Sequence, residues 1–369
     1  MIARYSWAGI STPLLNAASL FAEEGWRVVI YAPNADLDRF PFPSHLRGCL
    51  LGIPPEEARK LDVFGKFSIL RSAIKKSDLI FFFDHQSLFY LAGALFVKVK
   101  KVYFSLEFLE KNSNAELRLR SRLRYFLLKM LERLGAHWCD LVISQDLMRC
   151  NYLRTSLGVK RLSVVYNSPR KPIPSSDSRY FRDRFGIDDS VFILLCVGTL
   201  NEDTLLHFLL GCAPLLPKRF AIVLHGWFTD PRQAELARSL EKLYTGSIYV
   251  STDLVDSSKK WMIYNGSDSV FVGFSQSNNN LRLALGSAGK LYDALACGKP
   301  VVVNASHSHA FVNGKGIGKV VRDCHELATA LNEISNNYTE YQKRCLAASL
   351  EFSHDKSMVE SLSLLSISI

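Results

Sequence analysis

The sequence of 369 residues has no apolar run of the roughly 18 to 20 residues that a membrane-spanning helix needs. The apolar runs 80–83 and 301–303 are each bounded by polar residues. The first residues also lack the basic, apolar and small-residue order of a secretory signal, and they suit a first strand better. These absences predict a cytoplasmic protein without a transmembrane helix.

Motifs for several other chemistries are missing too. No GxGxxG follows the first expected strand and no GxxxxGK[ST] occurs, which disfavours a dinucleotide dehydrogenase and a P-loop NTPase. The eight cysteines form no CxxC pair and no Cys/His cluster at metal-ligand spacing. Cys196, Cys212 and Cys297 lie inside expected strands or helices. We therefore expect reduced core thiols, no metal site and no cofactor.

Positive charge, in contrast, is abundant in the first half. Residues 1–170 hold 25 Lys and Arg against 15 Asp and Glu, whereas residues 171–369 hold 20 of each sign. This asymmetry indicates an anionic partner for the first half, which is a phospholipid surface, a phosphorylated acceptor or nucleic acid. Nucleic acid is disfavoured, because the sequence has no basic face with interleaved aromatics and no recognised nucleic-acid module.

Short apolar runs alternate with helical stretches along the whole chain, which predicts strands buried on both faces in parallel sheets. The segment 168–178 holds three prolines and four serines and cannot continue a helix or a central strand. It divides the chain into two alternating halves. The expected strands are 2–5, 27–31, 79–83, 101–105, 140–144 and 162–166, then 191–197, 221–225, 248–251, 269–274, 301–304 and 318–321.

The chain length suits two α/β domains, since domains cluster near roughly 100 to 200 residues. We expect a first Rossmann-like domain over 1–168, a linker over 169–178 and a second Rossmann-like domain over 179–345. Residues 346–369 are expected to form a C-terminal helix that packs back on the first domain.

The loop and short helix after strand 269–274 are the most informative stretch. Ligands of parallel sheets bind beyond the carboxyl ends of the strands, where helix N-termini present free N–H groups. Gly286 and Ser287 open a helix whose dipole favours a diphosphate, with Lys290 as compensating charge. Asp293, one turn on, is placed to accept hydrogen bonds from a ribose. The alternative is an ordinary helix start with solvent-facing Lys290 and Asp293.

The stretch GSAGKLYDALACGKPVV at 286–302 resembles the nucleotide-sugar segment of the glycosyltransferase family 4-like (group 1) enzymes. Their pattern is a small residue, a Lys-Leu pair, an acidic residue and then Ala-x-Gly-x-Pro-Val. By this resemblance, Asp293 takes the place of the ribose-binding Glu, while Leu285 occupies the family's other acidic position. The resemblance implies the GT-B fold: two Rossmann-like domains with parallel sheets that face across a cleft, the first for the acceptor and the second for the donor.

Further segments are similar to the same family. The strand that ends at Gly198 resembles the one whose glycine lies beside the donor phosphates, and Gly226 resembles the next strand end. Members often carry Arg or Lys after the first of these glycines, where this chain has neutral and acidic residues, so Arg282 and Lys290 are expected to neutralise the diphosphate. Ser275 is a further donor-binding candidate. Gly9 remains from the family's glycine-rich turn, which faces the acceptor and the donor phosphates.

Three polar residues follow strands of the first half and are candidates for catalysis. Asp84 and His85 follow strand 79–83, and Glu107 follows strand 101–105. A carboxylate or imidazole in hydrogen-bond reach could orient or deprotonate an acceptor hydroxyl. The alternative is that these side chains satisfy the loop backbone.

The region 111–133 has the pattern of a basic amphipathic helix, with leucines interleaved among its basic residues. Such a helix can lie on anionic lipid; alternatively, its apolar stripe packs on the sheet. The basic residues are Arg118, Arg120, Arg122, Arg124, Lys129 and Arg133.

Together these patterns predict a glycosyltransferase that transfers a sugar from a UDP- or GDP-linked donor to a glycan or lipid-linked acceptor in cell-surface polysaccharide or glycoconjugate synthesis. The resemblance implies a metal-independent reaction with retention of configuration. The expected location is cytoplasmic, peripheral at the inner face of the membrane. The alternative is a non-catalytic GT-B binding or scaffold protein, favoured by the charge lost at Leu285 and after Gly198.

Overall fold

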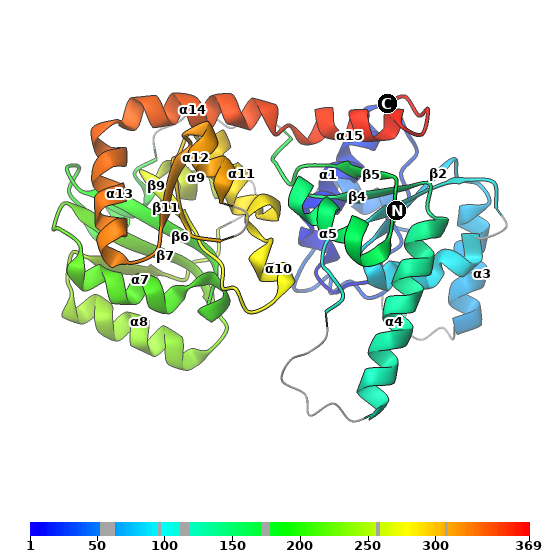
Figure 1. The fold of residues 1–369 in the computed structure, drawn as a ribbon, viewed down its shortest axis with the longest axis horizontal. Coiled ribbons are helices and arrows are strands. Elements are labelled where there is room, and N and C mark those ends of the chain that lie inside the picture. Colours follow the sequence, from blue (N-terminus) through cyan, green and yellow to red (C-terminus); the bar gives the residue numbers. More distant parts are fainter. Residues whose placement is uncertain (52–62, 95–96, 111–118, 171–177, 256–258, 307–308) are drawn as a thin grey trace. The chain divides into compact units, whose positions relative to one another are not determined.

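The protein is described from a computed structural model, which covers residues 1–51, 63–94, 97–110, 119–170, 178–255, 259–306 and 309–369 (Figure 1). Side chains of 63–67, 69, 92–93 and 119–121 are also left aside. Much of the predicted linker, 171–177, and the start of the predicted basic helix, 111–118, lie outside these ranges. The chain forms two compact units, residues 1–167 with 354–369, and residues 168–353.

The first unit is built on a five-stranded parallel sheet with the order β1-β2-β3-β4-β5. Strands β1, β2 and β4 are apolar and almost wholly buried, as expected for a sheet covered on both faces, whereas β3 begins with two lysines and β5 is half-buried. Its elements are β1 (Ile2–Ala3), α1 (Thr12–Glu23), α3 (Val63–Ile74), β2 (Leu79–Phe83), β3 (Lys100–Phe104), α4 (Leu119–Trp138), β4 (Leu141–Ser144), α5 (Leu147–Leu157), β5 (Leu162–Val164) and α15 (His354–Ser363), with short 3₁₀ helices at Ala8–Ile10, Ser44–Cys49 and His85–Ala94.

The predicted strand at 27–31 is wrong for most of its length. Ile30 and Tyr31 form isolated bridges, Tyr31 with Ile2 and Ile30 with Leu50. Residues 27–29 belong to no strand. The apolar residues Val28 and Val29 suggested a strand. Ile2, the first residue of β1, pairs with Tyr31, so no residue of β1 remains to pair with 27–29.

The C-terminal segment belongs to the first unit from residue 354. Met358 and Leu362 of α15 are fully buried in the same core cluster as Phe83 and Leu14. The Ser361 hydroxyl lies 2.8 Å from the hydroxyl of Ser163 in β5. The preceding helix α14 (Tyr338–Glu351) stays with the second unit.

The second unit holds a six-stranded parallel sheet with the order β11-β10-β9-β6-β7-β8. The predicted strands at 248–251, 301–304 and 318–321 match the observed ones at both ends. Its elements are α6 (Tyr180–Phe185), β6 (Phe192–Leu200), α7 (Leu206–Cys212), β7 (Phe220–Phe228), α8 (Pro231–Leu243), β8 (Ile248–Ser251), α9 (Lys260–Asn265), β9 (Ser269–Val272), α10 (Asn279–Arg282), α11 (Gly289–Ala296), β10 (Val301–Asn304), α12 (Ala310–Lys315), β11 (Gly318–Val321), α13 (Cys324–Asn336) and α14, with 3₁₀ helices at Glu202–Thr204, Ala213–Leu215 and Leu285–Ser287.

The expectation that all cysteines are reduced is wrong for one pair. Cys212 at the end of α7 and Cys324 at the start of α13 form a disulfide, with their Cα atoms 5.0 Å apart. They are 112 residues apart in the chain, so sequence spacing does not reveal the pair. The two helices meet because both pack on the core of the second unit. The other six cysteines are free thiols.

Candidate functional site

The strand order of the second sheet predicts where along the sheet a ligand binds. The chain starts the sheet at β6, adds β7 and β8 on one side, and then crosses to add β9, β10 and β11 on the other. In open parallel sheets, ligands bind at the carboxyl ends of the strands where the order reverses. Here that point lies between β6 and β9. The segment between β9 and β10, which includes α11, carries most of the predicted donor-binding residues, whereas Gly198 lies in β6 and Gly226 in β7.

The loop after β9 is held on both sides. On one side, the backbone N–H of Ser275 donates to the carbonyl of Asp203, which follows β6, at 2.9 Å. On the other, the side chain of Asn304, at the end of β10, accepts from the Phe274 N–H at 2.9 Å and donates to the Phe274 carbonyl at 3.0 Å. Sequence reasoning missed Asp203 and Asn304 as supports, because neither forms part of a motif.

Two glycines lie side by side near the ends of β6 and β7. Gly198 pairs with Gly226 in the parallel ladder. Gly226 has a φ of 151°, and a Cβ there would lie 1.8 Å from the Gly198 carbonyl oxygen. The close approach of the two strands therefore requires glycine at 226, whereas at 198 it is the φ of 102° that favours glycine. The neighbouring His225 donates to or accepts from Ser251 at 2.8 Å, and burial lowers its pKa.

The predicted phosphate-binding turn leads into α11. Gly286 is buried, and its carbonyl accepts a hydrogen bond from Tyr292. Ser287 is partly exposed and donates to the Ala284 carbonyl at 3.0 Å. Lys290, in the first turn of α11, holds its ammonium 5.1 Å from the centre of the Phe274 ring, and burial lowers its pKa. The turn is therefore accessible at Ser287, while Lys290 lies against an aromatic face.

Asp293 has partners that the sequence did not indicate. Lys260 of α9 donates to both of its carboxylate oxygens, at 3.0 and 3.1 Å, and the Tyr264 hydroxyl lies 3.3 Å away. Burial raises the pKa of Asp293, and the charge and hydrogen bonds of Lys260 and Tyr264 partly offset the rise. The alternative with a solvent-facing Asp293 does not hold, because its side chain is only 14 % exposed.

The two remaining predicted residues lie apart from these contacts. Arg282 ends α10 and reaches the Asn279 side chain at 3.5 Å. Gly9 is buried in the first unit, where a Cβ would lie 1.9 Å from the Phe40 carbonyl oxygen. Packing inside its own unit therefore explains the glycine at position 9 without a ligand.

In the first unit, the three predicted catalytic residues come together beyond the carboxyl ends of β2 and β3. The carboxylate of Asp84 lies 3.2 Å from the Nδ1 atom of His85 and accepts from the Glu107 backbone N–H, also at 3.2 Å. Asp84 is buried and has a φ of 67°, a left-handed conformation that is uncommon outside glycine. The cluster holds this strained residue in place, which is a pattern found at functional sites.

Neighbouring groups in this cluster shift the pKa values of both His85 and Glu107. Burial alone would lower the pKa of His85, but the hydrogen bond and charge of Asp84, together with Glu132, raise it above its ordinary value. Burial also raises the pKa of Glu107, against the opposing charge of Arg149. The Glu107 side chain is 55 % exposed, so water limits that rise.

Arg149 of α5 is a further member that sequence reasoning missed. It is buried, with its guanidinium 4.2 Å from the centre of the Phe108 ring and 3.8 Å from the Glu107 carboxylate. It also donates to the Leu106 carbonyl. Arg149 thus holds the loop after β3 through its contacts with Leu106 and Phe108, and it places a positive charge beside the Glu107 carboxylate. Its sequence context, an ordinary position on a helix, carried no signal.

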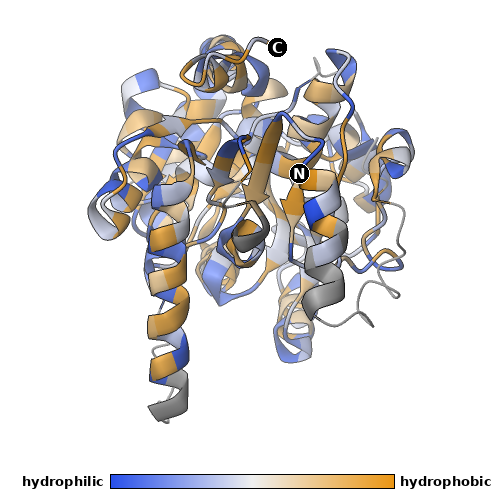
Figure 2. Cartoon of the chain, turned by 90° about the vertical axis from the view of Figure 1, so that its right-hand side faces the viewer, coloured by the Kyte–Doolittle hydropathy of each residue, from blue (hydrophilic) through white to orange (hydrophobic). Residues whose placement is uncertain are grey.

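The apolar stripe of α4 is exposed, as Figure 2 shows along the length of this helix. Leu123, Phe126 and Met130 are 57, 62 and 46 % exposed. The opposite face carries Glu132 and Ala136, which are buried. The alternative in which the apolar stripe packs on the sheet is therefore wrong. Arg118 lies outside the described residues, as does the side chain of Arg120.

The described ranges hold neither a membrane-spanning helix nor a metal-ligand cluster. No helix there is both long enough and apolar enough to cross a bilayer. Within the same ranges, no group of three or more His, Cys, Asp and Glu residues is arranged to hold a metal ion.

Solved structures show what the fold is similar to. HepE from Anabaena, in complex with UDP-glucose, has a TM-score of 0.70 and 14 % identity over 99 % of this chain and 98 % of its own. WaaG, a glycosyltransferase involved in lipopolysaccharide biosynthesis, has a TM-score of 0.65 and 15 % identity over 98 % of both chains. Sucrose-phosphate synthase from Thermosynechococcus elongatus has a TM-score of 0.64 and 16 % identity, covering 99 % of this chain and 98 % of its own.

These similarities confirm the predicted GT-B fold, with a parallel Rossmann-like sheet in each unit. No family model matches the chain. No curated protein has a matching sequence.

Proposed function

We propose that this protein is a glycosyltransferase that transfers a sugar from a nucleotide-sugar donor to a glycan or lipid-linked acceptor in cell-surface polysaccharide or glycoconjugate synthesis. The observation that carries the proposal is the position of α11. Its N-terminal turn lies at the switch point of the second sheet, and Asp293 lies one turn further along. The second unit thus binds the donor and the first unit binds the acceptor.

In the donor site, the N-terminus of α11 stabilises the diphosphate through its free N–H groups and helix dipole. Lys290 and Arg282 add positive charge. Asp293 accepts hydrogen bonds from the ribose, and Lys260 orients its carboxylate by donating to both oxygens. The loop after β9 needs little reorganisation on binding, because Asp203 and Asn304 already hold it.

In the acceptor site, the neutral imidazole of His85 accepts a hydrogen bond from the acceptor hydroxyl and directs its oxygen towards the donor. Asp84 orients the imidazole through the contact at Nδ1, so that Nε2 is the atom left for the acceptor. Glu107 contributes a second acceptor of hydrogen bonds beside it. We further propose that the reaction retains the anomeric configuration and uses no metal ion, because protein dipoles and basic side chains supply the charge at the leaving group.

The donor is proposed to be UDP-linked. HepE is solved with UDP-glucose, with UDP, and with UDP and glucose, and another similar structure is described as UDP-forming. A thermal-shift series with UDP, GDP and CMP tests this: we expect UDP to raise the melting temperature most. Incubation with UDP-sugars then measures turnover. Nucleotide binding without hydrolysis or transfer would favour the non-catalytic GT-B alternative, and a larger shift with GDP would overturn the UDP assignment.

The protein is further proposed to be cytoplasmic and to lie on anionic membranes through α4. The exposed apolar stripe enters the headgroup region, while the flanking Arg122, Arg124 and Arg133 contact anionic lipid, each with about 1 kcal/mol of attraction. We expect co-sedimentation with phosphatidylglycerol vesicles, weaker binding in high salt, and little binding to phosphatidylcholine vesicles.

The double variant Phe126→Ser with Leu127→Ser is expected to lose most of this vesicle binding. Leu147→Ser is the matched control, because Leu147 is an equally exposed leucine on α5 of the same unit. Equal sedimentation of wild type and the double variant, or indifference to lipid charge, would remove α4 as the membrane-binding element.

A further inference from the structure

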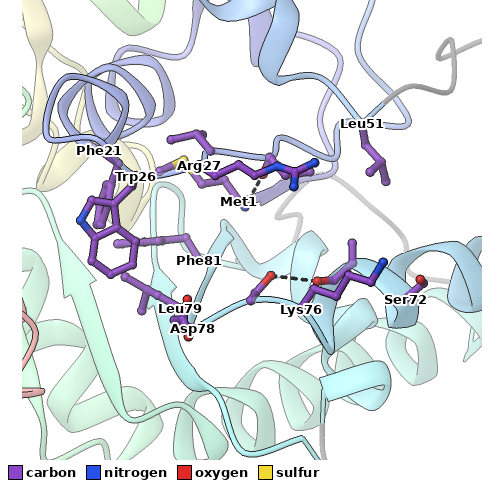
Figure 3. Close-up of a pocket in the computed structure, with 14 residues that line it drawn as sticks. Met1, Phe21, Trp26, Arg27, Leu51, Ser72, Lys76, Asp78, Leu79 and Phe81 are labelled. Atoms are coloured by element: carbon purple, nitrogen blue, oxygen red, sulfur yellow. Dashed lines mark hydrogen bonds between the residues drawn. The ribbon is translucent and has the colours of Figure 1, made fainter.

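A cavity of about 590 Å³ opens in the first unit at the end of the strands opposite to Asp84 (Figure 3). Met1 precedes β1 and Asp78 precedes β2, and both line the cavity, so it lies at the amino ends of these strands. Asp84 follows the other end of β2, a strand of five residues. Such a strand spans about 16 Å at about 3.3 Å per residue. The cavity is therefore separate from the candidate acceptor site.

The cavity exists because the segment 27–29 does not pair with β1 at this end of the sheet. The segment 27–29 is in no strand, although Ile30 and Tyr31 beyond it form bridges. The amino group of Met1 donates to the Val29 carbonyl at 2.8 Å, which holds this segment above the start of β2. The end of α3 lies on a further side, through Ser72 and Ala73. Backbone and side chains from three elements thus surround one space.

One end of the cavity has an apolar, aromatic wall. Phe21 contacts the Trp26 ring edge-on, with ring centres 5.3 Å apart, and contacts Phe81 in the same manner at 5.6 Å. Other apolar lining residues continue this wall. They are Met1, Val28, Val29, Ala73 and Leu79. Such a wall favours the binding of a hydrocarbon chain, because burying apolar groups against it removes their surface from water.

The other end carries positive charge. Figure 3 shows the charged ends of Arg27 and Lys76 on the side of the cavity where Leu51 lies, away from Trp26. Both side chains are exposed, and in the described part of the chain neither forms an ion pair with an acidic group. The acidic lining residue, Asp78, lies near Leu79 at the aromatic end in the same view. We call the Arg27 and Lys76 side the cationic mouth.

We propose that this cavity binds a single acyl chain that ends in an anionic head group. The chain lies against the aromatic wall, and the head group pairs with Arg27 and Lys76 at the cationic mouth. A sugar or a nucleotide fits less well, because its hydroxyls or ring nitrogens would lie against the apolar wall without hydrogen-bond partners. This ligand site is independent of the proposed sugar transfer, so either proposal can fail without the other.

The test is the binding of dansyl-labelled undecanoate to the full chain, at concentrations below micelle formation and followed by dansyl fluorescence. We expect saturable binding that decanoate displaces and decanol displaces poorly. The double variant Arg27→Gln with Lys76→Gln should weaken binding about tenfold, as expected for the loss of two exposed charge contacts. Lys75→Gln is the matched control and should bind as wild type, since Lys75 is exposed beside Lys76 but does not line the cavity.

Ala73→Phe fills the cavity and should abolish binding, with melting curves to confirm that the variant folds. Should this variant fail to fold, the Arg27 and Lys76 variant decides alone. The proposal is overturned if wild type shows no saturable binding, if decanol competes as well as decanoate, or if the double variant binds like the Lys75 control.

Discussion

Replacing His85 with alanine is expected to lower kcat by about 10²-fold or more, with little change in the KM for the donor sugar nucleotide. The reason is that the proposed role of His85 concerns the acceptor hydroxyl, whereas donor binding uses the second unit. The measurement is a steady-state assay with the donor and acceptor varied in turn. Because Asp84 orients the imidazole, Asp84→Asn should reduce kcat as well, while leaving His85 in place.

The pH dependence provides a readout that a purely structural role would not produce. His85 must be neutral to accept a hydrogen bond, and its pKa lies above the ordinary value of about 6.5. We therefore expect kcat to rise with pH, with a midpoint above about 6.5, as the property of the coupled Asp84, His85 and Glu107 group. His85→Ala should flatten this limb of the profile.

The same shift has a consequence for stability with a definite sign. A histidine whose pKa is raised by folding stabilises the fold fully below its ordinary pKa, and this contribution is lost as the pH rises through the folded value. His137→Ala is the control for the catalytic role of His85, since this exposed histidine of α4 makes its hydrogen bond within its own helix, to the Arg133 carbonyl. If His85→Ala and His137→Ala have the same kcat and the same pH profile, His85 has no catalytic role.

Asp293→Ala is expected to weaken UDP binding by roughly 10- to 100-fold, as the loss of a hydrogen bond to a charged group of about 1.5 to 3 kcal/mol predicts. The thermal shift produced by saturating UDP should shrink accordingly. The variant also leaves Lys260 without its carboxylate partner, so a lower melting temperature of the free protein is expected. Titration calorimetry with UDP measures the affinity directly.

Partner variants separate the ribose contact from the support of Asp293. Lys260→Met and Tyr264→Phe should each weaken UDP binding less than Asp293→Ala does, because they leave the carboxylate in place. Lys290→Ala tests the diphosphate end of the same helix. Asp230→Ala, which removes a helix cap of α8 in the same unit, is the control and should bind UDP as wild type. The donor site would be abandoned if UDP stabilised wild type, Asp293→Ala and Lys290→Ala equally.

Much of the architecture was predictable from local patterns. Buried strands such as 79–83 and 248–251 were located because continuous apolar runs between polar turns leave few alternatives. The strand 27–31 was mispredicted by the same rule, since Val28 and Val29 fit a strand but lack a neighbour that pairs with them. A local sequence pattern indicates the secondary structure that a segment prefers. Whether the segment joins a sheet depends on a neighbouring strand that is long enough to pair with it.

The sequence by itself determined the two parallel-sheet units, the glycine-marked turn before α11 and the placement of polar residues after β2 and β3, because periodicity and turn residues act over a few positions. Only the tertiary structure decided that Asp84 contacts both His85 and Glu107, that Lys260 holds Asp293, and that the stripe of α4 is exposed. These outcomes depend on residues that lie far apart along the chain or on what covers a helix face. A side chain's charge and accessibility follow from such neighbours, and no single stretch of sequence contains them.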